Sequence, residues 1–363
     1  MKYIKRKPGI LPEYDLRSIC PVEKMLLFDI ESTGLKKETT QLYLVGCAFF
    51  EDDEWNIVQW LTSNASDEET VLGEFLEFAS GFDVLVTFNG EGFDIPYIKY
   101  KAEYYGIKTD FGSKISLDIY KRAKRARKFL KMSSMSQKST ELFLGIDRDD
   151  LMDGGRLIPV YFDYERSGDV DKERLLLLHN YDDLQGMLKI LPVMAYTDCL
   201  EGGFDFRKAE EVQGFFVMEF VMNRPVPVSR EFQFGLTGEN ETVCISMDGK
   251  LLQISISIHS GIGKLPLNDI ENYYYLPDED RVIHKDVAQF IPGSRRRKAT
   301  RQNCHIKKAG KFLPGFNYTG LPAFIIDGDR KRTYMDYDSF VSAAVKKDYI
   351  GYAYDILSSV TCC

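Results

Sequence analysis

Two acidic residues at the end of an apolar stretch are the first candidates for chemistry. Asp29 and Glu31 close the run Met25-Leu-Leu-Phe-Asp-Ile-Glu31, which predicts a strand. Side chains at positions i and i+2 of a strand point to the same face, so the two carboxylates lie beside each other. Like charges at this spacing repel, and a nearby Mg²⁺ or Mn²⁺ is the usual remedy. The alternative is a solvated strand end with two incidental acids.

A third acidic residue follows a second apolar strand. Residues 83–88 predict this strand, and Asn89-Gly-Glu-Gly-Phe93 after it predicts a tight turn. Asp94, two positions before Pro96, then begins a helix. Taken alone, Asp94 is equally well explained as the N-cap of that helix.

The remaining candidates form a pair on a long helix. The apolar spacing of residues 172–192 predicts a helix on which His179 and Asp183 share one face, because they are four positions apart. An amphipathic helix with a satisfied His–Asp pair is the alternative. An imidazole at this place can also accept a proton from water near neutral pH.

Together the three segments form an ordered series: Asp-x-Glu on a first strand, Asn-x-x-x-Phe-Asp at a strand-to-helix junction, and His-x-x-x-Asp on a late helix. In this order the chain resembles the DEDD superfamily of 3′→5′ exonucleases, which have a ribonuclease H-like fold, and within it the bacterial YprB-like proteins. The resemblance covers residues 24–192, where Ser116-Leu-Asp118 and Leu142–Arg148 add to it. One position departs from the histidine branch of the superfamily: His179 stands at the spacing of the tyrosine branch.

The resemblance implies a catalytic site of four carboxylates and one imidazole. Asp29, Glu31 and Asp183 would hold one metal ion. Asp29 would bridge to a second ion, and Asp94 would act through the hydration shell of that ion. The two ions, Mg²⁺ or Mn²⁺, would lie about 3.5–4 Å apart and assist an in-line phosphodiester displacement. His179 would orient or deprotonate the attacking water.

Substrate contacts are expected at the turn residues and at basic segments. By resemblance, Asn89 and Phe93 shape the pocket and contact the terminal nucleotide, with Thr33 and Asp118 beside them. Two basic runs free of acids, at residues 121–128 and 294–298, could follow a phosphate backbone, although each could also be a solvated charged face. In the second run we expect Arg295, Arg296 and Arg297 to contact the substrate.

Composition and net charge limit the classes of protein to which this chain can belong. The 363 residues are 44% apolar, enough for a sizeable core, and no apolar segment is long enough to predict a membrane span. The basic N-terminal segment has no apolar stretch behind it, so a standard secretory signal is not expected. Seven scattered cysteines without metal-ligand spacing predict a reducing, cytoplasmic location. The net charge of −8 argues only mildly against nucleic-acid binding, because local basic patches decide it.

The predicted elements indicate an α/β fold, a ribonuclease H-like mixed sheet flanked by helices, followed by a smaller α+β domain. The domains are expected at residues 1–198 and 199–363, with nucleic-acid binding as a candidate role for the second. The predicted strands are 24–31, 41–50, 55–61, 83–88 and 251–259, and the predicted helices are 68–80, 94–106, 136–145, 172–192, 336–346 and 348–360.

Three functions fit these features. The first is a metal-dependent 3′→5′ exonuclease that acts on DNA or RNA, with a single-stranded 3′ end as its partner. The second is a ribonuclease H-like endonuclease or resolvase, against which Asn89 and Phe93 count because they belong to the exonuclease pattern. The third is a non-catalytic nucleic-acid-binding module, which has less reason to keep four carboxylates beside His179.

Overall fold

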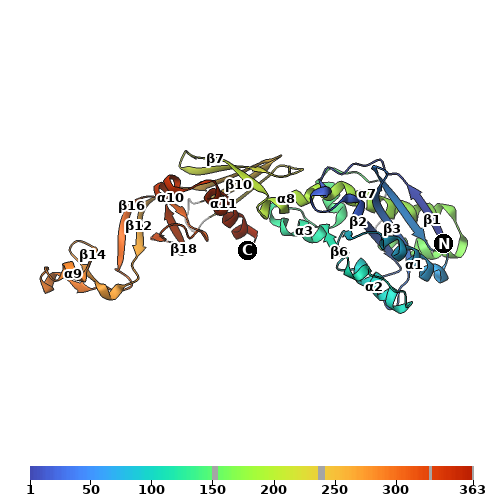
Figure 1. Ribbon diagram of the computed structural model, residues 1–363, viewed down its shortest axis with the longest axis horizontal. Coiled ribbons are helices and arrows are strands. Elements are labelled where there is room, and N and C mark those ends of the chain that lie inside the picture. The colour runs from blue at the N-terminus through green and yellow to red at the C-terminus, as the bar shows by residue number, and fades with distance from the viewer. Residues whose placement is uncertain (149–153, 236–241, 327–328, 362–363) are drawn as a thin grey trace. The chain divides into compact units, whose positions relative to one another are not determined.

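The chain folds into two compact units, Met1–Thr197 and Asp198–Cys363 (Figure 1). The structure is a computed structural model that describes residues 1–148, 154–235, 242–326 and 329–361. We refer to the two parts as unit 1 and unit 2 and describe each by itself. No helix within these described ranges combines the length and the apolar character needed to cross a membrane.

Unit 1 is built on a six-stranded sheet with the order β1-β4-β3-β2-β5-β6. Neighbouring strands from β1 to β2 are antiparallel, whereas β2, β5 and β6 are parallel. The predicted mixed sheet flanked by helices is therefore confirmed. The strands are β1 (Lys2–Arg6), β2 (Met25–Ser32), β3 (Leu42–Glu51), β4 (Glu54–Leu61), β5 (Val84–Thr87) and β6 (Ile115–Asp118).

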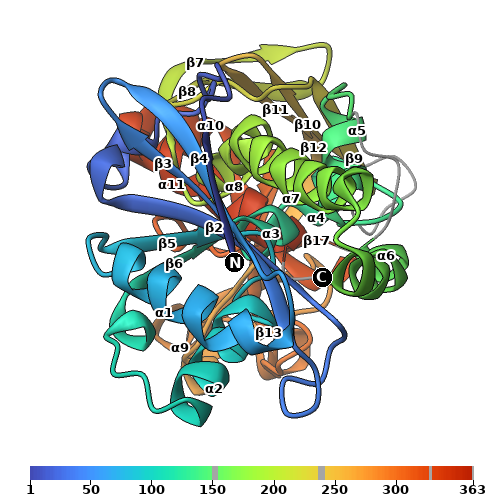
Figure 2. The ribbon, with the colours of Figure 1, turned by 90° about the vertical axis from the view of Figure 1, so that its right-hand side faces the viewer.

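Helices cover both faces of this sheet. On one face, alternate residues of β2, Leu26, Phe28 and Ile30, join the apolar core that α1 and α2 complete. On the other face, α7 packs against β2, β3 and β4 (Figure 2). The period of two along β2 thus turns Asp29 and Glu31 toward α7. The helices of unit 1 are α1 (Glu68–Ala79), α2 (Asp94–Tyr104), α3 (Ile119–Arg125), α4 (Arg127–Leu130), α5 (Gln137–Phe143), α6 (Gly154–Ser167) and α7 (Val170–Ile190).

The boundary between the two units lies within α8 (Met194–Leu200). After this helix, unit 2 consists mainly of strands. A five-stranded antiparallel sheet has the order β7-β8-β11-β10-β9, and alternate apolar residues of β8, β10 and β11 are buried on one face. The strands are β7 (Phe204–Val212), β8 (Phe215–Met222), β9 (Arg230–Gly235), β10 (Thr242–Asp248) and β11 (Leu251–Ser257).

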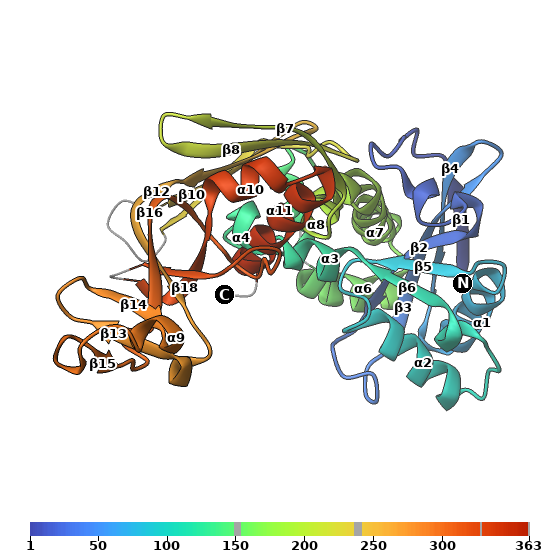
Figure 3. The same ribbon diagram turned by 60° about the vertical axis from the view of Figure 1, so that its left-hand side comes forward.

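A closed four-stranded barrel, β12-β16-β18-β17, follows in unit 2. Figure 3 shows a small body at the far ends of β12 and β16, made of α9 and a three-stranded sheet. The role predicted for residues 199–363 stays a prediction. These elements are β12 (His259–Pro266), β13 (Tyr273–Leu276), β14 (Arg281–His284), α9 (Lys285–Ala288), β15 (Arg297–Lys298), β16 (His305–Pro314), β17 (Phe324–Ile326), β18 (Asp329–Asp336), α10 (Tyr337–Ala343) and α11 (Lys346–Thr361).

A glycine allows α7 to approach the sheet of unit 1 closely. Gly46 of β3 pairs with Asp29 of β2 on one side and with Gln59 of β4 on the other. A Cβ atom at Gly46 would lie 1.9 Å from Oδ1 of Asn180 and 2.7 Å from Cδ1 of Leu184, both on α7. The absence of a side chain at this position is therefore a requirement of the packing between helix and sheet.

The first prediction tests this packing. Gly46→Ala should lower the free energy of unfolding by about 1–3 kcal/mol, the range for overpacking, because α7 must move away from β3. Gly73→Ala is the matched control, since Gly73 lies in α1 with open space around it and alanine should stabilise that helix by about 0.5–1 kcal/mol. Urea denaturation measures both changes. Equal stability of Gly46→Ala and the wild type would contradict the packing described.

Candidate active site

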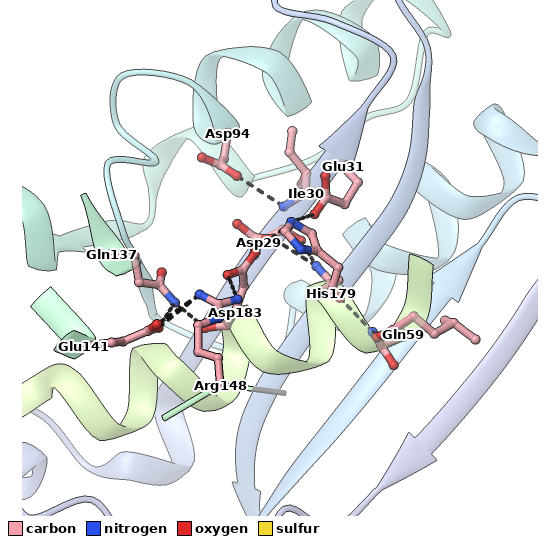
Figure 4. Close-up of polar contacts among 12 residues, drawn as sticks. Asp29, Ile30, Glu31, Gln59, Asp94, Gln137, Glu141, Arg148, His179 and Asp183 are labelled. Carbon is pink, nitrogen blue, oxygen red and sulfur yellow. Dashed lines mark hydrogen bonds and ion pairs between the residues drawn. The ribbon is translucent and has the colours of Figure 1, made fainter. Parts of the chain in front are cut away.

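The candidate site lies between β2 and α7. Figure 4 shows Asp29 and Glu31 on β2 facing His179 and Asp183 on α7. Nε2 of His179 is 3.4 Å from Oε1 of Glu31 and 3.3 Å from Oδ2 of Asp183. His179 is 4% exposed and Glu31 is 8% exposed, so both groups are largely removed from water. The strand and the late helix predicted to carry catalytic residues are thus brought together.

Asp94 approaches the same strand from the N-terminal end of α2. The backbone N–H of Ile30, between the two acids of β2, donates to Oδ1 of Asp94 at 3.2 Å. The N-cap of α2 is Phe93, and no side-chain hydrogen bond caps this end of the helix. The alternative interpretation of Asp94 as an N-cap is therefore wrong. Burial raises the pKa of Asp94 from 3.8 to about 7, although the Ile30 N–H opposes the rise.

Asp29 is in strong electrostatic conflict with the acids around it. Burial, and after it the charge of Asp183, raises the pKa of Asp29 well above its ordinary value of 3.8. Asp94 and Glu31 raise it further, whereas the hydrogen bond from Asn180 lowers it. The carboxylates therefore lie close enough to repel one another strongly, and a cation among them would relieve that repulsion.

Asn180 fixes the position of Asp29. Its Nδ2 donates to Oδ2 of Asp29 at 2.9 Å, and its Oδ1 accepts from Nε2 of Gln59 at 2.9 Å. Asp29, Gly46 and Gln59 are paired neighbours across three strands, so Asn180 spans the space above the glycine. The sequence analysis predicted neither the hydrogen bond from Asn180 to Asp29 nor the close approach of α7 at Gly46. A glycine inside an otherwise apolar strand was the available signal, because it often marks a close approach of another element.

A second network holds Asp183. The guanidinium of Arg148 contacts Oδ1 of Asp183 and also Oε2 of Glu141, the latter at 3.0 Å. Nε2 of Gln137 donates to Oε1 of Glu141 at 3.0 Å and to the backbone oxygen of Asp183 at 2.8 Å. Glu141 is 1% exposed and packs directly on Gly186 of α7. Arg148 therefore lies between two buried or half-buried carboxylates and compensates the charge of both.

The substrate-binding residues predicted in unit 1 lie in different environments. Asn89 is exposed at the end of β5, and Phe93 is half-buried and packs against Tyr97. Oγ1 of Thr33 accepts from the backbone N–H of Gln41, so it closes the connection after β2. These placements leave Asn89 and Phe93 near Asp94 as predicted contacts with the substrate.

Asp118 has a structural role in the fold, and its predicted contact with substrate stays a prediction. It is 3% exposed, and its carboxylate accepts from the backbone N–H groups of Asn89, Glu91 and Lys121. These three backbone bonds occupy most of the acceptor positions of this buried carboxylate. Asp118 caps α3 and fixes the turn after β5.

Two of the three arginines predicted to bind substrate in unit 2 interact with other groups of that unit. Nε of Arg295 lies 3.3 Å from Oδ2 of Asp278. The guanidinium of Arg296 lies 5.0 Å from the ring centroid of Tyr274 and donates to the backbone oxygen of Ala288. Arg297 is exposed on β15. The second basic run therefore contributes to the packing of the small body, and its contact with nucleic acid stays a prediction.

The donor atoms of the site fit a hard divalent cation. Donor atoms of Glu31, His179 and Asp183 all lie within 4.8 Å of one another. The predicted ligand set has Asp29 in place of His179, so the geometry adds the imidazole as a further possible ligand. Carboxylate oxygens are the ligands that Mg²⁺ and Mn²⁺ prefer, and mutual repulsion among them is what such a cation relieves. The arrangement can hold a metal ion and place an imidazole beside it.

The sequence of this region matches a known family. Residues 26–195 match the sequence profile of the RNase_H superfamily. Unit 1 has a ribonuclease H-like fold. The chain is also 25% identical over 100 residues to a DNA polymerase of Methanocaldococcus jannaschii, which covers 25% of this chain and 6% of that polymerase.

Solved structures that are similar to this chain include a polymerase and an exonuclease. One is the family B DNA polymerase of Pyrobaculum calidifontis, with 14% identity, a TM-score of 0.39, and coverage of 73% of this chain and 40% of that chain. The other is Escherichia coli exonuclease I with single-stranded DNA and zinc, with 9% identity, a TM-score of 0.28, and coverage of 93% and 71%. The chain spans less than half of each of the two polymerases.

The second prediction concerns pH. The folded ribonuclease H-like domain binds a proton at Asp94 more tightly than the unfolded chain does, because the pKa is raised from 3.8 to about 7. This contribution to stability is complete below pH 3.8 and is lost as the pH rises through about 7. Without divalent cations, the free energy of unfolding should fall over this interval, and Asp94→Asn should make the fall smaller. Urea denaturation at several pH values measures it, and an identical pH dependence in both proteins would contradict the assignment.

The third prediction concerns Arg148. Arg148→Met leaves Glu141 and Asp183 without their cation and should destabilise the metal-free protein by about 3–5 kcal/mol, the range for breaking a buried ion pair on one side. Mn²⁺ should raise the melting temperature of this variant more than that of the wild type, because the metal compensates Asp183. Arg166→Met is the control, since Arg166 is 76% exposed beside Asp163 and should change stability by at most about 1 kcal/mol. Equal Mn²⁺ responses would exclude charge compensation by Arg148.

Proposed function

We propose that unit 1 is a divalent-metal-dependent nuclease that removes nucleotides from the 3′ end of single-stranded DNA or RNA. The observation that carries this proposal is the convergence of Asp29, Glu31, Asp94 and Asp183 from three separate elements beside His179. The direction of hydrolysis and the preference for a strand end rest on the order of the three sequence motifs, which is the order of the DEDD exonucleases.

In this proposal each side chain has a distinct task. Asp29, Glu31 and Asp183 hold metal, and Asp94 acts through water bound on the same side. Mg²⁺ or Mn²⁺ would stabilise the negative charge that develops during displacement at phosphorus. His179 places the attacking water, because its Nε2 lies within 3.4 Å of carboxylates on both β2 and α7. Asn180 keeps Asp29 in one orientation, as outer partners of metal ligands do.

The fourth prediction tests the activity with the full chain. A 5′-labelled single strand in Mg²⁺ or Mn²⁺ should shorten progressively from its 3′ end. Asn180→Ala should lower turnover about 10–100-fold, the usual effect of losing an outer partner of a metal ligand, and Asp29→Asn or Asp183→Asn should lower it more. Asp163→Asn is the matched control, because Asp163 is a partly exposed acid on α6 with cationic partners of its own. Its turnover should equal that of the wild type.

Three outcomes separate the alternative functions. Cleavage of a closed circular single strand would show an endonuclease and overturn the requirement for an end. Binding of the labelled strand without metal-dependent hydrolysis would favour the non-catalytic module. Near-normal turnover in Asp29→Asn and Asp183→Asn would remove the assignment of this site altogether.

A further inference from the structure

A cavity of about 430 Å³ lies beside the candidate active site in unit 1. Two aromatic rings, Phe88 and Tyr120, form part of its wall, with centroids 5.9 Å apart and planes at 61°. Uncharged polar side chains line much of the rest, namely Asn89, Ser134, Ser136 and Gln137. The cavity therefore combines flat apolar surface with amide and hydroxyl groups, and none of the described side chains that line it is charged.

The cavity adjoins the backbone of the elements that carry two of the carboxylates. Gln137, which lines it, donates to the backbone oxygen of Asp183 at 2.8 Å. Asn89, also in its lining, belongs to the turn that leads from β5 into Asp94. A ligand in the cavity would thus lie next to the two elements that carry Asp94 and Asp183.

The same cavity borders the first basic run. Nζ of Lys124 lies 5.5 Å from the ring centroid of Tyr120, and Lys124 and Arg127 are both exposed on α3 and α4. Asp118 accepts from the backbone N–H of Asn89 and from that of Lys121 on α3. One buried carboxylate therefore fixes the turn, the aromatic wall and the basic helix relative to one another.

We infer that this cavity binds one base of a single-stranded nucleic acid, while Lys124 and Arg127 contact phosphates of the same strand. The inference rests on the proposed function for the neighbouring carboxylates. A nucleobase is a neutral, flat heterocycle, so it suits the uncharged lining of the cavity. The phosphates linked to it are negative, so they suit the cations Lys124 and Arg127. Stacking on an aromatic side chain suits any base, so the cavity provides affinity without a sequence requirement.

The fifth prediction is measured by binding, on the full chain with hydrolysis removed by Asp29→Asn. Fluorescence anisotropy compares an intact single strand with strands that carry one abasic site, moved stepwise from the 3′ end. One abasic position should weaken binding about 5- to 150-fold, the range for losing one stacked base. Tyr120→Ala should weaken binding of the intact strand by a similar factor and abolish the difference between intact and abasic strands. Tyr120→Phe should retain both affinity and discrimination.

Controls separate stacking from a general loss of structure. Tyr104→Ala removes a ring that is 68% exposed on α2 and outside the cavity, so it should bind as the parent does. If Tyr120→Ala does not fold, 2-aminopurine placed at the sensitive position of the strand still reports the cavity, because stacking quenches its fluorescence. Lys124→Gln with Arg127→Gln should reduce the slope of log affinity against log salt by about 0.7 for each phosphate that no longer meets a cation.

The failure of this inference is distinguishable from failure of the proposed function. If the wild type degrades strands but no abasic position weakens binding, the cavity holds no base and the inference is overturned while the function stands. Discrimination that persists unchanged in Tyr120→Ala also overturns it. If the wild type hydrolyses nothing but the abasic position and Tyr120 still control binding, the cavity assignment stands and the nuclease proposal fails.

Discussion

Crowding of acidic side chains between β2, α2 and α7 is the constraint on which the rest of unit 1 depends. Each of three carboxylates has a separate compensating group: Asn180 donates to Asp29, a backbone amide of β2 to Asp94, and Arg148 to Asp183. These partners are buried or half-buried, so the site is preorganised by the protein before any cation is bound. The remaining repulsion, expressed in the raised pKa of Asp29, is the part left for a metal ion to relieve.

The elements that carry these acids were predictable because their patterns are local and strong. The observed bounds of β2 and α7 fall within two residues of the predicted ones. Elements without such patterns were not predicted. β1 is a polar edge strand that owes its place to pairing with β4. Pro159 lies inside α6, where the sequence rule predicts a break.

The partners of the catalytic residues were not predictable for a different reason. Gln59 and Asn180 are 121 positions apart, and neither carries a charge or a motif that points to the other. Arg148 belongs to a segment that helped to establish the resemblance, yet only the fold shows that it reaches Asp183. The resemblance places Asp118 among the substrate contacts, and only the fold shows that its buried carboxylate accepts from three backbone amides.

The place of Asn180 above Gly46 also determines when the site can form. The hydrogen bond from Asn180 to Asp29 joins residues 151 positions apart, and loops of that length close late in folding. All six strands of the sheet precede α7 in the chain, so the sheet can pair before the helix arrives. A nascent chain that has emerged only as far as β6 holds Asp29, Glu31 and Asp94 but lacks His179 and Asp183. The complete carboxylate cluster therefore exists only after α7 has been synthesised and has docked, and an unfinished chain carries three of the four carboxylates without the helix that closes the site.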